Sequence, residues 1–244
     1  LVTGGPSEPG RRTRLVTVSL VSFYNGHRID WQPFQETVRR LAPQAVLSVD
    51  VTQALGRVVL DCQDADILIS STHKWTLGIH GGCIVGVPAA KAARLTTHAG
   101  GWLHLENAFH ADRFERAEPK RGASSFSVGM PNFAAVYALN ASLRYLEGIG
   151  LAAIEAHANP LVAEAEAGLL QLGLQPMCPW QSENPSGILA FQHPRSAELH
   201  AALEHAGIHV MHQAGRIRLA VHGYNTGRDI RHFLETTAVF LASA

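Results

Sequence analysis

The chain has 244 residues, 46% of them hydrophobic, which is enough apolar material for a substantial core and a second, smaller domain. Lysine plus arginine and aspartate plus glutamate both number 20, so the formal net charge of zero gives no bulk attraction to nucleic acid or to an anionic membrane surface. No apolar run reaches the roughly 18 to 20 residues of a membrane-spanning helix, and residues 1–14 are rich in glycine, proline and arginine, unlike a signal sequence. The composition predicts a soluble, cytoplasmic protein.

The cysteines and histidines do not predict a metal site. The three cysteines are widely scattered and include no Cys-x-x-Cys pair, which favours reduced thiols over a disulfide framework or a zinc site. His205, His209 and His212 lie close together in the sequence, and a metal cluster is the alternative interpretation of this group. No second set of ligands with a recognised spacing accompanies them, so we expect no metal.

The first half of the chain alternates apolar strands with helical sequence. Residues 15–23 are apolar and β-branched and predict a buried strand, and the apolar spacing in residues 34–41 predicts a helix. Further apolar runs predict strands at 45–49, 67–70 and 83–87. Strands that are near-continuous apolar runs, with helical sequence between them, indicate an α/β fold with a mainly parallel sheet.

A long helical pattern after Pro131 ends at Gly148-Ile149-Gly150, where we expect a hinge between two domains. This divides the chain into part of a large domain, residues 1–148, and a small C-terminal domain, residues 149–244.

The second domain is predicted to combine helices with a small sheet. Residues 154–169 have the spacing of an amphipathic helix, and strands are expected at 187–192 and 217–221. Further helices begin near Ser196 and near Thr226, where Thr-Gly-Arg-Asp has the spacing of a capping box. The C-terminal domain is therefore expected to be α+β.

Polar residues follow two of the predicted strands. Asp50 closes one strand, and Ser71, His73 and Lys74 follow the next, before a glycine-rich stretch. Reactive groups gather beyond the carboxyl ends of parallel strands. A lysine is rarely placed at the end of a buried strand unless its amine is paired or used, and a desolvated lysine is a nucleophile able to form a Schiff base with an aldehyde. We therefore expect a site here with a buried Lys74 amine.

The neighbouring residues suit a pyridine-containing aldehyde cofactor. A carboxylate such as Asp50 placed against a pyridinium nitrogen keeps the ring protonated, which makes it an electron sink. Gln53 can form a hydrogen bond with a ring hydroxyl, and Ser71 and His73 can donate to a phosphate. These residue types also occur in α/β domains without a cofactor, so their spacing alone leaves a purely structural interpretation open.

Four segments occur in the order seen in class V aminotransferases. They are VSFYNGHRID (21–30), VDVTQALG (49–56), STHKW (71–75) and RLAVHGYNT (218–226). From about Arg11 to its end the chain resembles this family, which includes cysteine desulfurases, selenocysteine lyases and isopenicillin N epimerase-like proteins. The resemblance implies the fold-type I architecture of transferases that depend on pyridoxal 5'-phosphate, with a partial large domain and a small C-terminal domain.

The resemblance also implies roles for particular residues in binding the cofactor. Lys74 is implied to be the Schiff-base lysine, Asp50 the partner of the pyridine nitrogen and Gln53 the neighbour of the ring hydroxyl. Ser71 and His73 look like ligands of the phosphate.

On the substrate side, Arg218 looks like the guanidinium that takes the α-carboxylate, a task suited to the bidentate geometry of arginine. The family often has asparagine where this chain has Phe23, and Asn25 is the substitute that we expect. Cysteine desulfurases carry a nucleophilic cysteine shortly before this arginine. Residues 209–215 contain none and Cys178 lies far upstream, so desulfuration is not expected.

Two further departures concern the phosphate. The glycine-threonine pair that reaches the phosphate of the neighbouring subunit appears here as Gly129-Met130, and methionine cannot donate a hydrogen bond. Family members also have an N-terminal portion with a phosphate-binding loop, and nothing before Arg11 resembles it. The leading hypothesis is a homodimeric enzyme acting on an amino acid or related amine by transamination, elimination or epimerisation. The alternative is a truncated or non-catalytic remnant or subunit.

Overall fold

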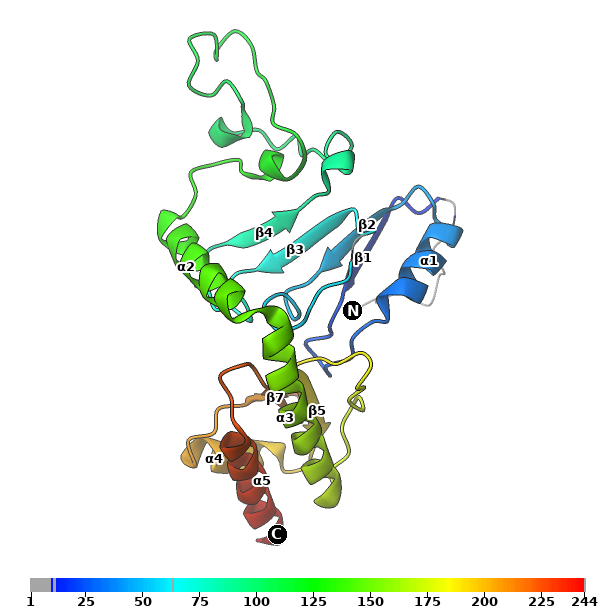
Figure 1. The fold of residues 1–244 in the computed structure, drawn as a ribbon, viewed down its shortest axis with the longest axis vertical. Coiled ribbons are helices and arrows are strands. Elements are labelled where there is room, and N and C mark those ends of the chain that lie inside the picture. The colour runs from blue at the N-terminus through cyan, green and yellow to red at the C-terminus, as the bar shows by residue number, and fades with distance from the viewer. Residues whose placement is uncertain (1–9, 11, 63, 244) are drawn as a thin grey trace. The chain divides into compact units, whose positions relative to one another are not determined.

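A computed structural model of the chain describes residues 10, 12–62 and 64–243 (Figure 1). The expectation about a signal sequence in residues 1–14 falls largely outside the described part. Among the described residues, no helix combines the length and the apolar character needed to cross a membrane. The chain divides into two compact units, which are described separately.

The first unit comprises residues 1–19, 30–52 and 61–143, and the second comprises 20–29, 53–60 and 144–244. The inclusion of two short early segments in the second unit is a feature that the sequence did not indicate. The boundary near residue 148 that we predicted stays a prediction.

The first unit is built on a four-stranded sheet. Its strands, in spatial order, are β1 (Leu15–Ser19), β2 (Val46–Asp50), β3 (Ile67–Ser71) and β4 (Cys83–Gly86). The first three are parallel, as the apolar runs predict, and their pairing aligns Ser19 with Asp50 and Asp50 with Ile69. Helix α1 (Trp31–Leu41) connects β1 to β2 and buries Trp31 and Val38. This confirms the predicted helix.

Two predicted strands differ from the structure. The sequence pattern suggested that the last strand, like the others, is parallel, but β4 pairs with β3 in antiparallel orientation. The connection at residues 72–82 contains no helix, and a parallel crossover needs a longer connection. The strand predicted at 15–23 ends at Ser19, because the chain turns between Ser22 and Gly26, where the Gly26 amide donates to the Ser22 carbonyl at 3.0 Å.

A buried carboxylate joins the elements of the first unit at the start of β3. Asp66 is only 3% exposed. One of its oxygens accepts from the Leu47 amide at 2.7 Å and from Arg39 at 2.8 Å, and the other lies 2.8 Å from Lys91 Nζ. Burial opposes ionisation, but the hydrogen bonds from Lys91, Leu47 and Arg39 outweigh it, so the pKa of Asp66 lies below its ordinary value.

The segment after β4 runs through three short 3₁₀ helices, Ala89–Lys91, Trp102–His104 and Gly122–Phe126, to helix α2 (Phe133–Ile149). Figure 1 shows this segment leaving the sheet at β4. Gly150, with φ of 85°, separates α2 from the next helix, α3 (Leu151–Gln171), and this confirms the helix predicted to end near residue 149.

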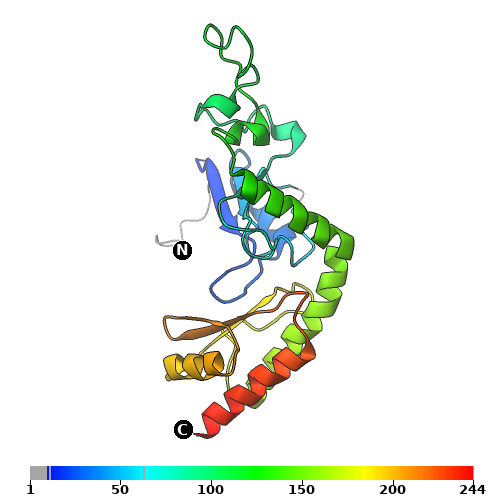
Figure 2. The ribbon, with the colours of Figure 1, turned by 90° about the vertical axis from the view of Figure 1, so that its left-hand side faces the viewer.

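The second unit packs helices on a three-stranded antiparallel sheet (Figure 2). The sheet has the order β5 (Ile188–Gln192), β7 (Arg216–Ala220) and β6 (Met211–Gln213), and the helices are α3 (Leu151–Gln171), α4 (Ser196–His205) and α5 (Gly227–Ala242). Buried side chains from all three helices and from β5 and β7 form one core. The predicted α5 capping position is confirmed, since the Thr226 amide donates to Asp229 at 2.8 Å. Of the three strands of this sheet, β6 was not predicted, because three residues are too few to show an alternation of apolar and polar side chains.

Candidate active site

The site-forming residues of the first unit lie at the carboxyl edge of the parallel strands. Because β2 and β3 are parallel, Asp50 and Ser71, the last residues of these strands, lie at the same edge of the sheet, and His73 and Lys74 follow within three residues of Ser71. This is the arrangement that the strand pattern predicted. It puts a carboxylate, a hydroxyl, an imidazole and an amine in one region of the first unit.

Thr52 links the ends of the two strands. Its amide donates to Asp50 Oδ1 at 2.8 Å, and its own hydroxyl oxygen accepts from the Ser71 amide at 3.0 Å. The Val51 amide donates to the Ile69 carbonyl at 2.8 Å, so the sheet pairing continues past the end of β2. The Asp50 carboxylate is therefore oriented by the backbone that follows it.

Ser71 provides the test of whether a phosphate fits this region. Its hydroxyl oxygen is buried and has no hydrogen-bond partner within the described part of the chain. A buried hydroxyl left unsatisfied costs about 1–3 kcal/mol, so a group that pairs with it is stabilised there. Phosphate oxygens accept hydrogen bonds from hydroxyls, and the residue that was implied to be a phosphate ligand therefore fits that role.

The turn after β3 is held tightly. The Thr72 hydroxyl donates to the Ile79 carbonyl at 2.7 Å, and the Thr76 hydroxyl donates to the Thr72 carbonyl at 2.8 Å. A Cβ atom at Gly78 would lie 2.4 Å from the Thr72 carbonyl oxygen, so only glycine fits there. Hydrogen bonds at Thr72 and Thr76 thus hold the backbone on either side of His73 and Lys74.

His73 is stacked on His80, a residue that the sequence did not single out. The two ring centroids are 3.8 Å apart and the planes differ by 19°. Partial burial lowers the pKa of His73, and the neighbouring His80 and Lys74 lower it further. A neutral His73 still carries one ring N–H that can donate to a phosphate.

Lys74 differs from the expectation of a buried amine. Its side chain is exposed in the described chain, whereas the next residue, Trp75, is 6% exposed and fills the core. Lys74 lies three residues past the last residue of β3, in the turn that follows the strand. The described part of the chain does not supply the desolvation that we expected for this amine.

Gln53 is buried at 8% exposure and begins the segment 53–60 of the second unit. The same segment contains Arg57, whose side chain is fully buried and whose Nε donates to the Val221 carbonyl at 2.7 Å. Burial lowers the pKa of Arg57 to about 10, and Glu155 partly counteracts this. The one sequence signal for this residue is an arginine directly followed by Val-Val-Leu.

The substrate residues that we predicted lie near one turn of the second unit. Arg218 is on β7, and its Nη1 donates to the carbonyl of Phe23 at 2.8 Å. The Asn25 side chain accepts from the His27 amide at 3.2 Å, so it stabilises this turn. Burial lowers the pKa of Arg218, and the neighbouring Arg216 lowers it further.

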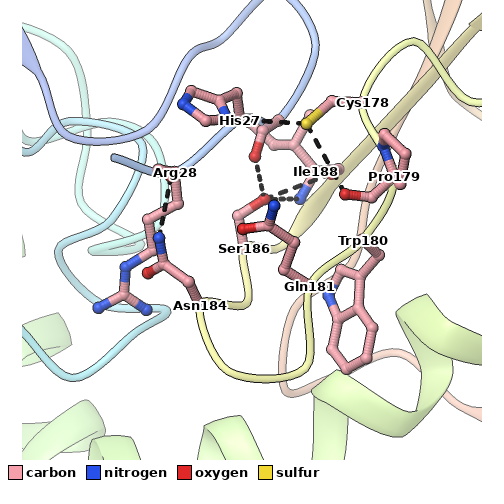
Figure 3. A pocket seen from close by; sticks show the side chains of 10 residues that line it. His27, Arg28, Cys178, Pro179, Trp180, Gln181, Asn184, Ser186 and Ile188 are labelled. Atoms are coloured by element: carbon pink, nitrogen blue, oxygen red, sulfur yellow. Dashed lines mark hydrogen bonds between the residues drawn. The ribbon is translucent and has the colours of Figure 1, made fainter. Parts of the chain in front are cut away.

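Cys178 lies in a small cavity of the second unit (Figure 3). Its sulfur points toward His27, 3.8 Å from Nδ1. Burial raises the pKa of the Cys178 thiol, and Glu166 raises it further, which disfavours the nucleophilic thiolate. The cavity measures about 10 Å³, room for about one water molecule. This supports the view that Cys178 does not replace the cysteine of a desulfurase.

The histidines of the C-terminal unit do not gather as their sequence spacing suggested. His212 lies beside His200, with 5.3 Å between ring centroids, and it contacts the Ser196 hydroxyl at 3.1 Å. His200 contacts the Val210 carbonyl at 3.1 Å. Within the described ranges, no group of three or more histidine, cysteine, aspartate or glutamate side chains could hold a metal ion.

The comparisons with known proteins agree with the sequence motifs. The family model for aminotransferase class-V matches residues 8–233, so the chain belongs to the class V aminotransferase family. It is 29% identical over 228 residues to the uncharacterized aminotransferase YcbU of Bacillus subtilis, covering 93% of this chain and 59% of that protein. It is 30% identical over 174 residues to a cysteine desulfurase of Dickeya dadantii, covering 68% of this chain and 40% of that protein.

Solved structures show the same fold. The apo structure of a cysteine desulfurase from Thermococcus onnurineus matches with a TM-score of 0.83 at 22% identity, covering 96% of this chain and 61% of that one. The fold-type I prediction is therefore confirmed, and so is the predicted membership of the class V aminotransferase family. The chain spans about 60% of the length of the Bacillus subtilis protein and of the Thermococcus onnurineus chain.

Proposed function

We propose that the protein containing this chain is a pyridoxal-phosphate enzyme that acts on an amino acid or a related amine, with Lys74 as the covalent attachment point of the cofactor. The observation that carries this proposal is the buried, unpaired hydroxyl of Ser71 at the sheet edge shared with Asp50, three residues before Lys74. A hydroxyl that lacks a partner beside an oriented carboxylate suits a ligand that brings both a phosphate and a basic nitrogen.

Besides Lys74, four residues would hold the cofactor. Asp50 would pair with the pyridine nitrogen, Gln53 would contact the ring hydroxyl, and Ser71 and His73 would donate to the phosphate. Pyridoxal phosphate, when bound, supplies an electron sink for a carbanion at the substrate α-carbon. The Thr52 amide supports this arrangement because its hydrogen bond to Oδ1 holds the Asp50 carboxylate in one orientation.

The chain's own residues would then handle the substrate. Lys74 Nζ would take the α-proton and return it, a task for which its flexible four-carbon stem is suited. Arg218 would bind the α-carboxylate, with Asn25 in the turn beside it. These roles are common to transamination, elimination and epimerisation, so they define the substrate class and leave the reaction type open.

We also propose that the whole protein is a homodimer in the cytoplasm. Several large apolar side chains between residues 102 and 137 are exposed: Trp102, Phe109, Phe114, Met130 and Tyr137. Phe114 is 87% exposed, and a concentration of such residues on one segment suits an interface. The loop at 125–131 would face the partner. Three free cysteines are in keeping with a reducing compartment.

Borohydride reduction of the cofactor-loaded whole protein tests the role of Lys74. Reduction should attach the pyridoxyl group to the peptide that contains His73, Lys74 and Trp75, as identified by mass spectrometry. Lys74→Ala should lose both the label and the visible absorbance, while Lys120→Ala should keep both. A label on another lysine, or none at saturating cofactor in folded protein, would favour a non-catalytic remnant.

A further inference from the structure

Strand β7 carries two arginines that alternate along it, Arg216 and Arg218, so both side chains extend from the same face of the sheet. Arg216 has no exposed surface at all. In the described residues neither arginine forms a salt bridge with a carboxylate. Burying a guanidinium without a countercharge is costly, so its contacts need a specific explanation.

Arg216 is held by polar and aromatic contacts. Its Nη1 donates to the carbonyl of Tyr24, and its guanidinium carbon lies 4.1 Å from the centre of the Tyr24 ring, within the range of a cation–π interaction. Its Nη2 lies 3.4 Å from Gln213 Oε1 and 3.7 Å from the sulfur of Met211, both on β6. These contacts surround the charge with dipoles and a π face but do not neutralise it.

The hairpin between β6 and β7 fixes the position of Arg216. Gln213 pairs directly with Arg216 in the sheet, and only Ala214 and Gly215 connect them. Both connecting residues have positive φ, 51° and 76°, as a tight two-residue hairpin turn requires. An alanine in this conformation is strained, which shows how closely the turn geometry is specified.

The two arginines donate hydrogen bonds to consecutive residues of one turn. Arg216 binds the carbonyl of Tyr24, and Arg218 binds the carbonyl of Phe23 at 2.8 Å. The Nε atoms of both arginines are buried and have no partner in the described chain. Arg218 is only partly buried, so of the two it is the one that a ligand can reach.

We propose that Arg216 is a positioning residue for the carboxylate site at Arg218: it fixes the turn at Phe23 and Tyr24 against which Arg218 is aligned, and it adds a second positive charge behind Arg218. The proposal rests on the proposed function, in which Arg218 takes the substrate carboxylate. It deepens that function, because two adjacent guanidiniums without a carboxylate partner favour an anionic substrate over a simple amine.

The test compares two probes with the cofactor-loaded whole protein. L-alanine carries an amine and a carboxylate, and ethylamine carries the amine alone, and the binding of each is followed by the change in visible absorbance. Arg216→Met keeps much of the side-chain volume but removes the charge and the donors. It should raise the apparent Kd for L-alanine about tenfold and leave that for ethylamine within about twofold.

Three further variants make the outcome decisive. Arg216→Lys keeps the charge and should raise the L-alanine Kd by only about threefold. Tyr24→Leu removes the ring beneath the guanidinium but keeps the carbonyl. It should also raise the L-alanine Kd, but by less than Arg216→Met does, and it replaces Arg216→Met in the test if that variant does not fold. Arg195→Met, at a partly exposed arginine paired with Glu198, is the matched control and should bind both probes as the parent does.

An unchanged L-alanine Kd in Arg216→Met, or an equal rise for both probes, would overturn the positioning role. Borohydride labelling of the same samples separates this result from failure of the proposed function. A labelled parent whose Arg216→Met variant keeps the parent's preference for L-alanine contradicts only the role of Arg216. A parent that takes no label at Lys74 contradicts the proposed function itself.

Discussion

Replacing Asp66 by asparagine should destabilise the first unit and weaken the site at the opposite end of the same strand. Asp66 accepts from the Leu47 amide and from Arg39, and it pairs with Lys91. Asparagine keeps one acceptor oxygen, but its NH₂ group, a donor, replaces the other oxygen, which accepts a hydrogen bond in the parent. One of the two cationic partners therefore faces another donor, and both lose their countercharge.

The contacts set the size of the effect. Hydrogen bonds to a charged group contribute about 1.5–3 kcal/mol each, and breaking a buried ion pair from one side costs about 3–5 kcal/mol. The side chains of Arg39 and Lys91 are 26% and 32% exposed, so water can partly replace the lost partner. We therefore expect a loss of about 3 kcal/mol in the free energy of unfolding at neutral pH, toward the lower end of the range.

The same prediction has a pH dependence with a definite sign. The pKa of Asp66 in the folded protein lies below its ordinary value. Its contribution is therefore fully present above the ordinary aspartate pKa of about 4 and is lost as the pH falls through the lower folded pKa. The difference in stability between the parent and Asp66→Asn should shrink as the pH is lowered from about 5 toward 2.

Urea denaturation followed by tryptophan fluorescence measures this effect, since Trp31 and Trp75 are buried in the first unit. Asp64→Asn is the matched control, because Asp64 is exposed and the same chemical change there should alter stability by no more than about 0.5 kcal/mol. Equal stabilities of the two variants at pH 7, or a difference that grows as the pH falls, would refute the role assigned to the Asp66 carboxylate.

The remaining predictions concern the site. Asp50→Asn keeps the acceptor for the Thr52 amide, so circular dichroism should show an intact fold while turnover falls at least about tenfold, and parent-like turnover would remove Asp50 from the mechanism. Arg218→Lys keeps the charge but loses the fork, and steady-state kinetics should show KM for an amino acid rising about tenfold with a smaller change in kcat; an unchanged KM would contradict the carboxylate role. Cys178→Ser should leave turnover within about twofold of the parent, because burial and the neighbouring Glu166 raise the pKa of its thiol and disfavour the thiolate, and a large loss would reopen the question of desulfuration. Light scattering of the whole protein should give a dimer, which a fully active monomer would contradict.

The elements near the site were predictable because their signals are local. The apolar runs around Val49 and Leu68 predict buried strands whatever the rest of the chain does, and a strand that ends at Asp50 puts that carboxylate at the sheet edge. The order of four short segments, from the turn at residues 21–30 to the motif that begins at Arg218, was sufficient to indicate the family, which the comparison confirms. The roles of the individual site residues remain predictions.

Contacts between distant segments were decided only by the tertiary structure. The sequence did not show that Thr52 joins Asp50 to Ser71, that His80 stacks on His73, or that β4 reverses direction. Lys74 was expected to be buried and is exposed, because burial depends on what covers the strand end and not on the strand itself. Arg216 reads in the sequence as one charged residue in a short strand, yet it is fully buried because a turn 192 residues earlier supplies the Tyr24 carbonyl and ring. The apolar periodicity of a segment predicts which of its side chains are buried. The partner of a polar group depends on which distant segments folding brings beside it.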